Sequence, residues 1–199
     1  MAINLQKGGD KHSIDLQKSS GSLSIHANLN WLQEAPEKGF FAMFKKNTQA
    51  DLDLGCMYEM LDGSIGVIQP LGNSFGSKSQ SPFIYLDKDD RSGAANDGEN
   101  MFVFKPELVK RIMFFAMIYE GATDFISVKS SMFFKISNGE EVTLTLDNAG
   151  TNKMFCSAAL ITNNNGKLEI QKETRYFDGH EEADKFYGFG FRWQAGSKD

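Results

Sequence analysis

The chain is poor in cysteine, proline and histidine: its 199 residues include two Cys, four Pro and three His. Two cysteines cannot form the disulfide framework of a small secreted domain. Cys56 and Cys156 both lie in apolar segments, which is typical of reduced core thiols. His12, His26 and His180 are scattered, and none has a second histidine at the spacing of a zinc site. The sequence therefore argues against a disulfide-stapled protein and against a zinc enzyme.

Long hydrophobic runs and an excess of positive charge are also missing. The longest apolar run, residues 112–119, is too short to cross a bilayer, and the first seven residues lack the apolar core of a secretory signal. We therefore expect a cytoplasmic protein. The 21 basic and 26 acidic residues give a net charge of −5. This charge disfavours nucleic acid as a partner, and it disfavours anionic membranes unless a cation mediates the contact.

Strand patterns dominate what is present. Alternation of apolar and polar residues predicts half-buried strands at 23–27, 142–146 and 168–170. Continuous apolar runs predict strands covered on both faces at 112–118 and 132–134. Dipeptides that favour hairpin turns occur at 62–63, 138–139 and 165–166.

Helical signals are few. One helical turn is predicted at 106–111, where Pro106 suits the first turn, and a second at 181–185. Strand signals recur about every ten residues, and no linker separates them. The predicted fold is all-β, a two-sheet antiparallel β-sandwich with one or two short helical turns, forming a single domain over residues 1–199.

The C-terminal segment 186–199 is aromatic. In an extended chain Phe189, Phe191 and Trp193 share one face, opposite Gly188, Gly190 and Arg192. These rings either pack onto the sandwich as a last strand or anchor a partner. We favour packing, because termini with this much apolar surface rarely stay free.

An acidic segment rich in glycine spans residues 87–100. Gly93 and Gly98 let the backbone turn the acids toward one point, as a calcium ion with six to eight oxygen ligands requires. The spacing does not match an EF-hand. The alternative is a solvated loop that Lys88 and Arg91 partly neutralise. The candidate metal ligands in this segment are Asp87, Asp89, Asp90, Asn96, Asp97 and Glu99.

Two further acids lie in the predicted strand 50–58. Its even positions are apolar, so Asp51 and Asp53 project together from the other face. Adjacent like charges are disfavoured unless a cation or basic groups lie over them. We therefore add Asp51 and Asp53 to the candidate metal ligands. The alternative is an exposed edge pair balanced by Lys45 and Lys46.

Several of these motifs occur together, in order, in a known family. They are NLQKGG at 4–9, LNW at 29–31, DLDL at 51–54, DGE at 97–99 and TDF at 123–125. In this order the chain resembles the TerD-type family associated with tellurite resistance and stress response. The end of the chain, YGFGFRW at 187–193 followed by AGS at 195–197, looks more like the TerA branch. The resemblance implies a cytoplasmic β-sandwich that binds calcium through Asp51, Asp53 and acids of the 87–99 segment. This chain departs from the family pattern in its shorter acidic loop and in Gly98, where members carry an acid.

Together these features predict a non-enzymatic, calcium-binding component of a tellurite-resistance or stress-response system, acting as a binding or scaffolding module beside other proteins of that system. Two alternatives belong to other classes. One is a sandwich that docks on anionic lipid through calcium, and the other is a redox protein that acts on the oxyanion. The redox alternative needs an activated thiol or cofactor site, which the sequence does not reveal.

Overall fold

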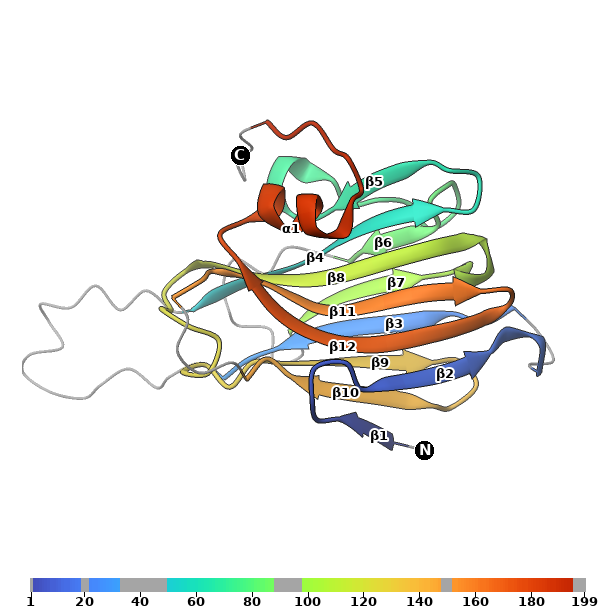
Figure 1. Ribbon diagram of the computed structural model, residues 1–199, viewed down its shortest axis with the longest axis horizontal. Coiled ribbons are helices and arrows are strands. Elements are labelled where there is room, and N and C mark those ends of the chain that lie inside the picture. Colours follow the sequence, from blue (N-terminus) through green and yellow to red (C-terminus); the bar gives the residue numbers. More distant parts are fainter. Residues whose placement is uncertain (1, 19–21, 33–49, 88–97, 148–151, 195–199) are drawn as a thin grey trace, which may run out of the picture.

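The computed structural model describes residues 2–18, 22–32, 50–87, 98–147 and 152–194, and these residues form two stacked sheets (Figure 1). The first sheet, sheet A, has the strand order β1 (Ala2–Leu5), β10 (Glu141–Thr145), β9 (Ser131–Ile136), β3 (Ile25–Asn30), β7 (Glu99–Val103) and β6 (Ile84–Leu86). The second, sheet B, has the order β2 (Lys11–Asp15), β12 (Lys167–Phe177), β11 (Phe155–Asn164), β8 (Val109–Glu120), β4 (Asp51–Met60) and β5 (Ile65–Ile68). The pairings are antiparallel except for β1 with β10, which is parallel. The predicted all-β sandwich is confirmed.

The hairpin predictions are also confirmed. The turns at 62–63, 138–139 and 165–166 join β4 to β5, β9 to β10 and β11 to β12. At the last turn Asn165 and Gly166 both have positive φ, 54° and 85°. A two-residue hairpin turn of the primed type needs positive φ at both central positions, which is why Asn-Gly marks it.

Two predicted boundaries differ from the structure. The strand predicted at 23–27 begins at Ile25 and continues to Asn30. The helical turn predicted over 106–111 is a 3-10 turn, η4 (Pro106–Leu108), and Val109 begins β8. The remaining short 3-10 turns are η1 (Leu16–Lys18) and η3 (Leu71–Asn73). Strand β8 is paired on both sides, with β4 and β11, so its ladder prevails over the local helical preference of 109–111.

Strand β8 carries apolar side chains on both faces, as its continuous apolar run predicts. Phe114 packs in the main core between the sheets, whereas Phe115 belongs to a second cluster on the outer face of sheet B. The members of this outer cluster are Met57, Met113, Phe115, Phe155, Phe177, Ala183 and Phe189.

Residues 178–194, which we call the C-terminal strap, cover that outer cluster. The strap contains the helix α1 (His180–Tyr187), which confirms the helical turn predicted at 181–185. Phe189 is only 6% exposed, and Phe191 and Trp193 pack against the same cluster. The predicted last strand is wrong, because Gly188 adopts a left-handed conformation that ends the helix and turns the chain. No helix in the described ranges is long and apolar enough to cross a membrane.

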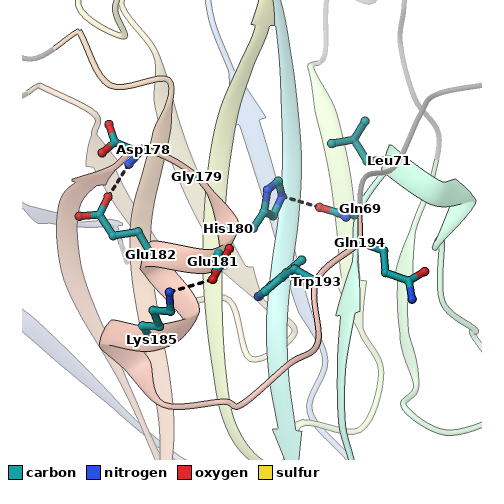
Figure 2. A pocket seen from close by; sticks show the side chains of 10 residues that line it. All are labelled: Gln69, Leu71, Asp178, Gly179, His180, Glu181, Glu182, Lys185, Trp193 and Gln194. Atoms are coloured by element: carbon teal, nitrogen blue, oxygen red, sulfur yellow. Dashed lines mark hydrogen bonds and ion pairs between the residues drawn. The ribbon is translucent and has the colours of Figure 1, made fainter.

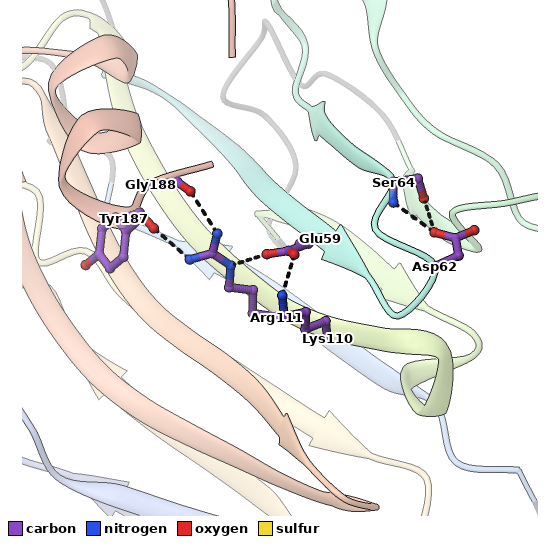
Figure 3. A network of polar contacts seen from close by, with 7 residues as sticks. All are labelled: Glu59, Asp62, Ser64, Lys110, Arg111, Tyr187 and Gly188. Carbon is purple, nitrogen blue, oxygen red and sulfur yellow. Dashed lines mark hydrogen bonds and ion pairs between the residues drawn. The ribbon is translucent and has the colours of Figure 1, made fainter. Parts of the chain in front are cut away.

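Arg111 of β8 fastens the strap to the sheet (Figure 3). Its guanidinium donates to the carbonyl oxygens of Tyr187 at 2.6 Å and Gly188 at 3.0 Å, which are orphan acceptors at the end of α1. The same group donates to Glu59 of β4 at 2.7 Å and lies 4.2 Å from the centre of the Phe189 ring. Hydrogen bonds from Lys110 and Arg111 hold the pKa of Glu59 below its ordinary value. One arginine thus joins two strands of sheet B to the C-terminal strap.

Asp184 fixes the path of the strap beyond the helix. This buried carboxylate accepts hydrogen bonds from the backbone N–H groups of Gly190 and Phe191 at 2.8 and 2.9 Å, and from the Trp193 indole at 3.0 Å. Because the side chain of Asp184 takes these backbone donors, they are not available for pairing with a strand.

We expect Asp184→Ala to destabilise the protein by about 2 to 3 kcal/mol, because it leaves partly buried donors without their acceptor. Urea unfolding followed by circular dichroism measures this loss. The control is Glu181→Ala on the same helix, whose side chain is 65% exposed and whose removal should cost about 0.5 kcal/mol or less. Equal losses in the two variants would show that Asp184 does not hold the strap in place.

Candidate functional site

Three predicted metal ligands are buried. Asp53 is 1% exposed, Asp51 is 9% exposed and Glu99 is fully buried. Leu52 and Leu54 belong to the core between the sheets, so the alternating Asp51 and Asp53 lie on the opposite face of β4. The exposure expected in the alternative is wrong for these two acids, since both side chains are removed from solvent. Lys45 and Lys46, the lysines of that alternative, lie outside the described residues.

Glu99 links the two sheets next to Asp53. It belongs to β7 of sheet A, and its Oε2 accepts a hydrogen bond from the backbone N–H of Leu54 in sheet B at 2.6 Å. Strand β5 pairs with β4 only from Cys56 onward, so the N–H of Leu54 lies on a stretch of β4 edge that β5 leaves open. A carboxylate from the opposite sheet thus satisfies a backbone donor that strand pairing does not.

Gly98 explains how Glu99 reaches this position. Its φ is +65°, and a Cβ placed there would lie 2.1 Å from the carbonyl oxygen of Leu29 on β3. Only glycine fits so close to a neighbouring backbone in this conformation. The chain can therefore enter β7 directly against β3, with Glu99 as its first residue.

The remaining predicted ligands belong to the segment that joins β6 to β7. Asp87 is exposed, and its backbone N–H donates to the carbonyl oxygen of Asn100 at 2.9 Å. Because β6 and β7 are antiparallel neighbours, Asp87 and Gly98, which flank residues 88–97, lie near each other beside Glu99. Asp89, Asp90, Asn96 and Asp97 lie outside the described residues and stay predictions.

The chemistry of the described acids fits a hard cation, since carboxylate oxygens are the ligands that calcium prefers. Among the residues that the structure describes, no three His, Cys, Asp or Glu side chains gather closely enough to hold a metal ion. The structure thus brings Glu99 to the backbone of Leu54, the residue that follows Asp53 in β4. It does not assemble a coordination sphere from the described residues alone.

A polar network on the outer face of sheet A escaped the sequence analysis. Asn100, the residue after Glu99, accepts a hydrogen bond from Asn28 Nδ2 at 3.0 Å, and its Oδ1 lies 2.7 Å from His26 Nε2. The His26 ring also stacks on Phe102, with ring centres 4.6 Å apart. The available signal was the alternation of His26 and Asn28 in β3, which places both on one face. This network anchors the start of β7, and therefore Glu99, to β3.

A cavity of about 680 Å³ lies between the C-terminal strap and the segment that follows β5 (Figure 2). His180 and Trp193 line it together with amide and carboxylate side chains. His180 Nε2 lies 2.7 Å from Gln69 Oε1. Burial lowers the pKa of His180 to about 4, so the imidazole is neutral at neutral pH. No local sequence pattern indicates this cavity, because its walls are more than 100 residues apart in the chain.

Both cysteines are free and buried, as predicted. Burial raises the pKa of the Cys56 and Cys156 thiols well above the ordinary value. The thiolate is the reactive form of cysteine, so neither side chain is activated for nucleophilic or redox chemistry.

The chain is similar in sequence to a known protein. No family model matches the chain. The tellurium resistance protein TerA of an Alcaligenes species is 32% identical over 192 residues. The aligned region covers 95% of this chain and 57% of the relative, so the chain spans little more than half the relative's length. Together with the motifs at 51–54 and 97–99 and the sandwich fold, this similarity to TerA supports assignment of the chain to the TerD-like family.

Proposed function

We propose that the protein is a calcium-binding, non-enzymatic component of a tellurium-resistance or stress-response system, in which it acts as a binding or scaffolding module. The relative named for tellurium resistance supports the biological role. Because this chain spans only part of that relative, the role is proposed from the shared region.

The burial of acids at one edge of β4 carries the calcium proposal. Glu99 and Asp53 come from different sheets and are essentially inaccessible to solvent. Burying ionised carboxylates is costly unless positive charge compensates them. Asp87 and Gly98 flank the segment 88–97, which contains further acids. A calcium ion at this edge would compensate the buried charge and accept oxygen ligands from both the strands and the segment.

The proposed ligand set is the one predicted from the sequence. Asp51, Asp53 and Glu99 would supply oxygens from the sandwich, and Asp87, Asp89, Asp90, Asn96 and Asp97 are the candidates in the acidic segment. The cation would neutralise these acids and stabilise the edge of β4. We assign it no catalytic role.

The remaining parts of the proposal concern partners and location. The partners are calcium ions and other proteins of the same system, and nucleic acid is disfavoured by the net charge of −5. A cytoplasmic location agrees with two free, buried thiols. The raised pKa values of these thiols argue against a redox protein that acts on the oxyanion directly.

Calcium-dependent docking on anionic lipid is a second candidate, favoured by exposed apolar side chains near the start of β4. Leu32, Tyr119 and Ile126 are 55%, 47% and 42% exposed. Leu32 lies near the start of β4 because it follows Trp31, whose indole donates to the carbonyl of Ala50. Tyr119 lies there because it precedes Glu120, the residue paired with Asp51. Calcium that bridges acids to headgroups, beside apolar side chains that insert, would give such docking.

We expect calcium to stabilise the fold. After treatment with a chelator, addition of calcium to one hundred times the dissociation constant should raise the free energy of unfolding by about 2.7 kcal/mol. Thermal unfolding measures the change, with magnesium as the comparison ion. An unchanged melting temperature in excess calcium would contradict the proposal.

The variant Asp53→Asn removes one negative ligand at almost unchanged volume, so calcium affinity should fall about tenfold or more. Isothermal titration calorimetry measures it. The control is Glu107→Gln, which changes an exposed acid in η4. This turn lies beside the opposite end of β4, because the N–H of Leu61, just after β4, donates to the carbonyl oxygen of Leu108 in η4. If both variants lose affinity equally, overall charge and not a site at Asp53 governs binding.

Sedimentation with vesicles tests the lipid candidate. Docking predicts that the protein sediments with phosphatidylserine vesicles in calcium but not in chelator, and that Ile126→Ser reduces the bound fraction. The control is Leu61→Ser, which changes an apolar side chain 58% exposed at the opposite end of β4. Sedimentation independent of calcium, or equally reduced by both variants, would remove this candidate.

A further inference from the structure

The cavity beside the C-terminal strap is separate from the calcium proposal. It lies between the strap and the residues after β5, and none of the predicted metal ligands lines it. Figure 2 shows Asp178, Glu182 and Lys185 on the side of α1 and Gln69, Leu71 and Gln194 on the other, with His180 and Trp193 between them. Both sides belong to folded elements, so the cavity has fixed walls.

Its aromatic surface is held in place from behind. The Trp193 indole donates its N–H to Asp184, and its ring centre lies 5.1 Å from that of His180. His180 in turn packs against Phe115 and Phe155 of the outer cluster. A ring fixed in this way presents a preorganised surface, which reduces the entropic cost of binding a flat group.

Carboxylates surround this aromatic surface. Asp178, Glu181 and Glu182 line the cavity, and Lys185 is the one lysine that does so among the described residues. Lys153 pairs with Asp178 and lies 3.7 Å from Glu182, whose carboxylate also accepts the Asp178 backbone N–H at 2.6 Å. Lys185 bonds Glu181 at 2.8 Å, but the side chains of Lys185 and Glu181 are both more than 60% exposed. Exposed lysine pairs of this kind contribute little free energy. A cation with better geometry can therefore take the place of Lys185.

The strap already binds two guanidinium groups by the same chemistry. Arg111 lies 4.2 Å from the Phe189 ring and bonds Glu59, and Arg175 lies 4.4 Å from the Phe186 ring with Glu173 Oε2 at 3.8 Å. In each case one arginine contacts an aromatic ring and a carboxylate. Trp193 with the nearby acids is a third set of this kind, and no arginine within the described ranges lines the cavity.

We propose that this cavity receives an arginine side chain from a basic segment of a partner protein. The guanidinium stacks on Trp193 and bonds the carboxylate of Glu181, where it takes the place of Lys185. Arginine suits this site better than lysine because its planar group stacks on a ring while it forms paired hydrogen bonds with carboxylates. The net charge of −5 also attracts a basic partner. This binding does not depend on calcium.

The test measures binding of short peptides to the protein in the presence of a chelator. The readout is the indole N–H signals of the two tryptophans in a nitrogen-15 NMR spectrum. The variant Trp193→Phe identifies the signal of Trp193. Acetyl-Gly-Arg-Gly-amide should shift this signal in a saturable way. The citrulline peptide has nearly the same shape without the charge and should leave it unchanged, and the lysine peptide should bind more weakly.

The variant Glu181→Gln should weaken binding of the arginine peptide about tenfold, because it removes the charge from the hydrogen-bonding partner of the guanidinium. The control, Glu107→Gln, changes net charge equally outside the cavity and should bind as the unmodified protein does. The proposal is overturned if the Trp193 signal shows no saturable shift or if the citrulline or lysine peptide binds equally well. Equal weakening in the control would overturn it too.

Discussion

The structure depends on one constraint: β8 carries large apolar side chains on both faces, so sheet B needs cover on both sides. Sheet A covers one face and buries Phe114, while the C-terminal strap covers the other and buries Phe115. Burial of a phenylalanine side chain contributes about 1.5 to 3 kcal/mol. The strap is therefore part of the core, although it comes last in the chain.

The contacts that hold the C-terminal strap on sheet B also shape the surface that the strap exposes to other molecules. A helix laid over a sheet ends with unpaired carbonyl groups, and Arg111 bonds two of them while it bonds Glu59 of β4. Asp184 then binds the backbone beyond the helix and orients the Trp193 ring. The groups that close the outer cluster thus also form the aromatic wall of the cavity.

A second constraint acts at the start of β4, where β5 does not reach. An open strand edge needs partners for its backbone groups, and Glu99 from the opposite sheet supplies one. This solution buries the charged carboxylate of Glu99 at Leu54, the residue that follows Asp53 in β4. Structural need and the proposed ion site coincide here. A cation at this edge would compensate a charge that the strand arrangement itself introduces.

The sequence alone determined the fold class, most strands and the hairpins, because these follow from local patterns. Alternation identified half-buried strands, a continuous apolar run identified β8, and Asn165-Gly166 identified a turn that needs positive φ. Sequence also selected Asp51 and Asp53, because they alternate with apolar strand positions, and Glu99, because it belongs to the acidic segment rich in glycine. Local patterns could not reveal that all three acids are buried, because burial depends on elements far away in the chain.

Only the tertiary structure decided the rest. The pairing of β8 on both sides shortened the helical turn to 106–108, and Asp184 binds the backbone of Gly190 and Phe191, where a last strand was expected. Lys172 illustrates the same limit: it is 1% exposed inside β12, where its ammonium bonds the carbonyl of Gln6 and the carboxylate of Asp147. A lysine is normally exposed, and no local pattern predicts partners 166 and 25 residues away. Long-range contacts cannot be derived from local periodicity, since that periodicity shows which face of a strand is buried but not what covers it.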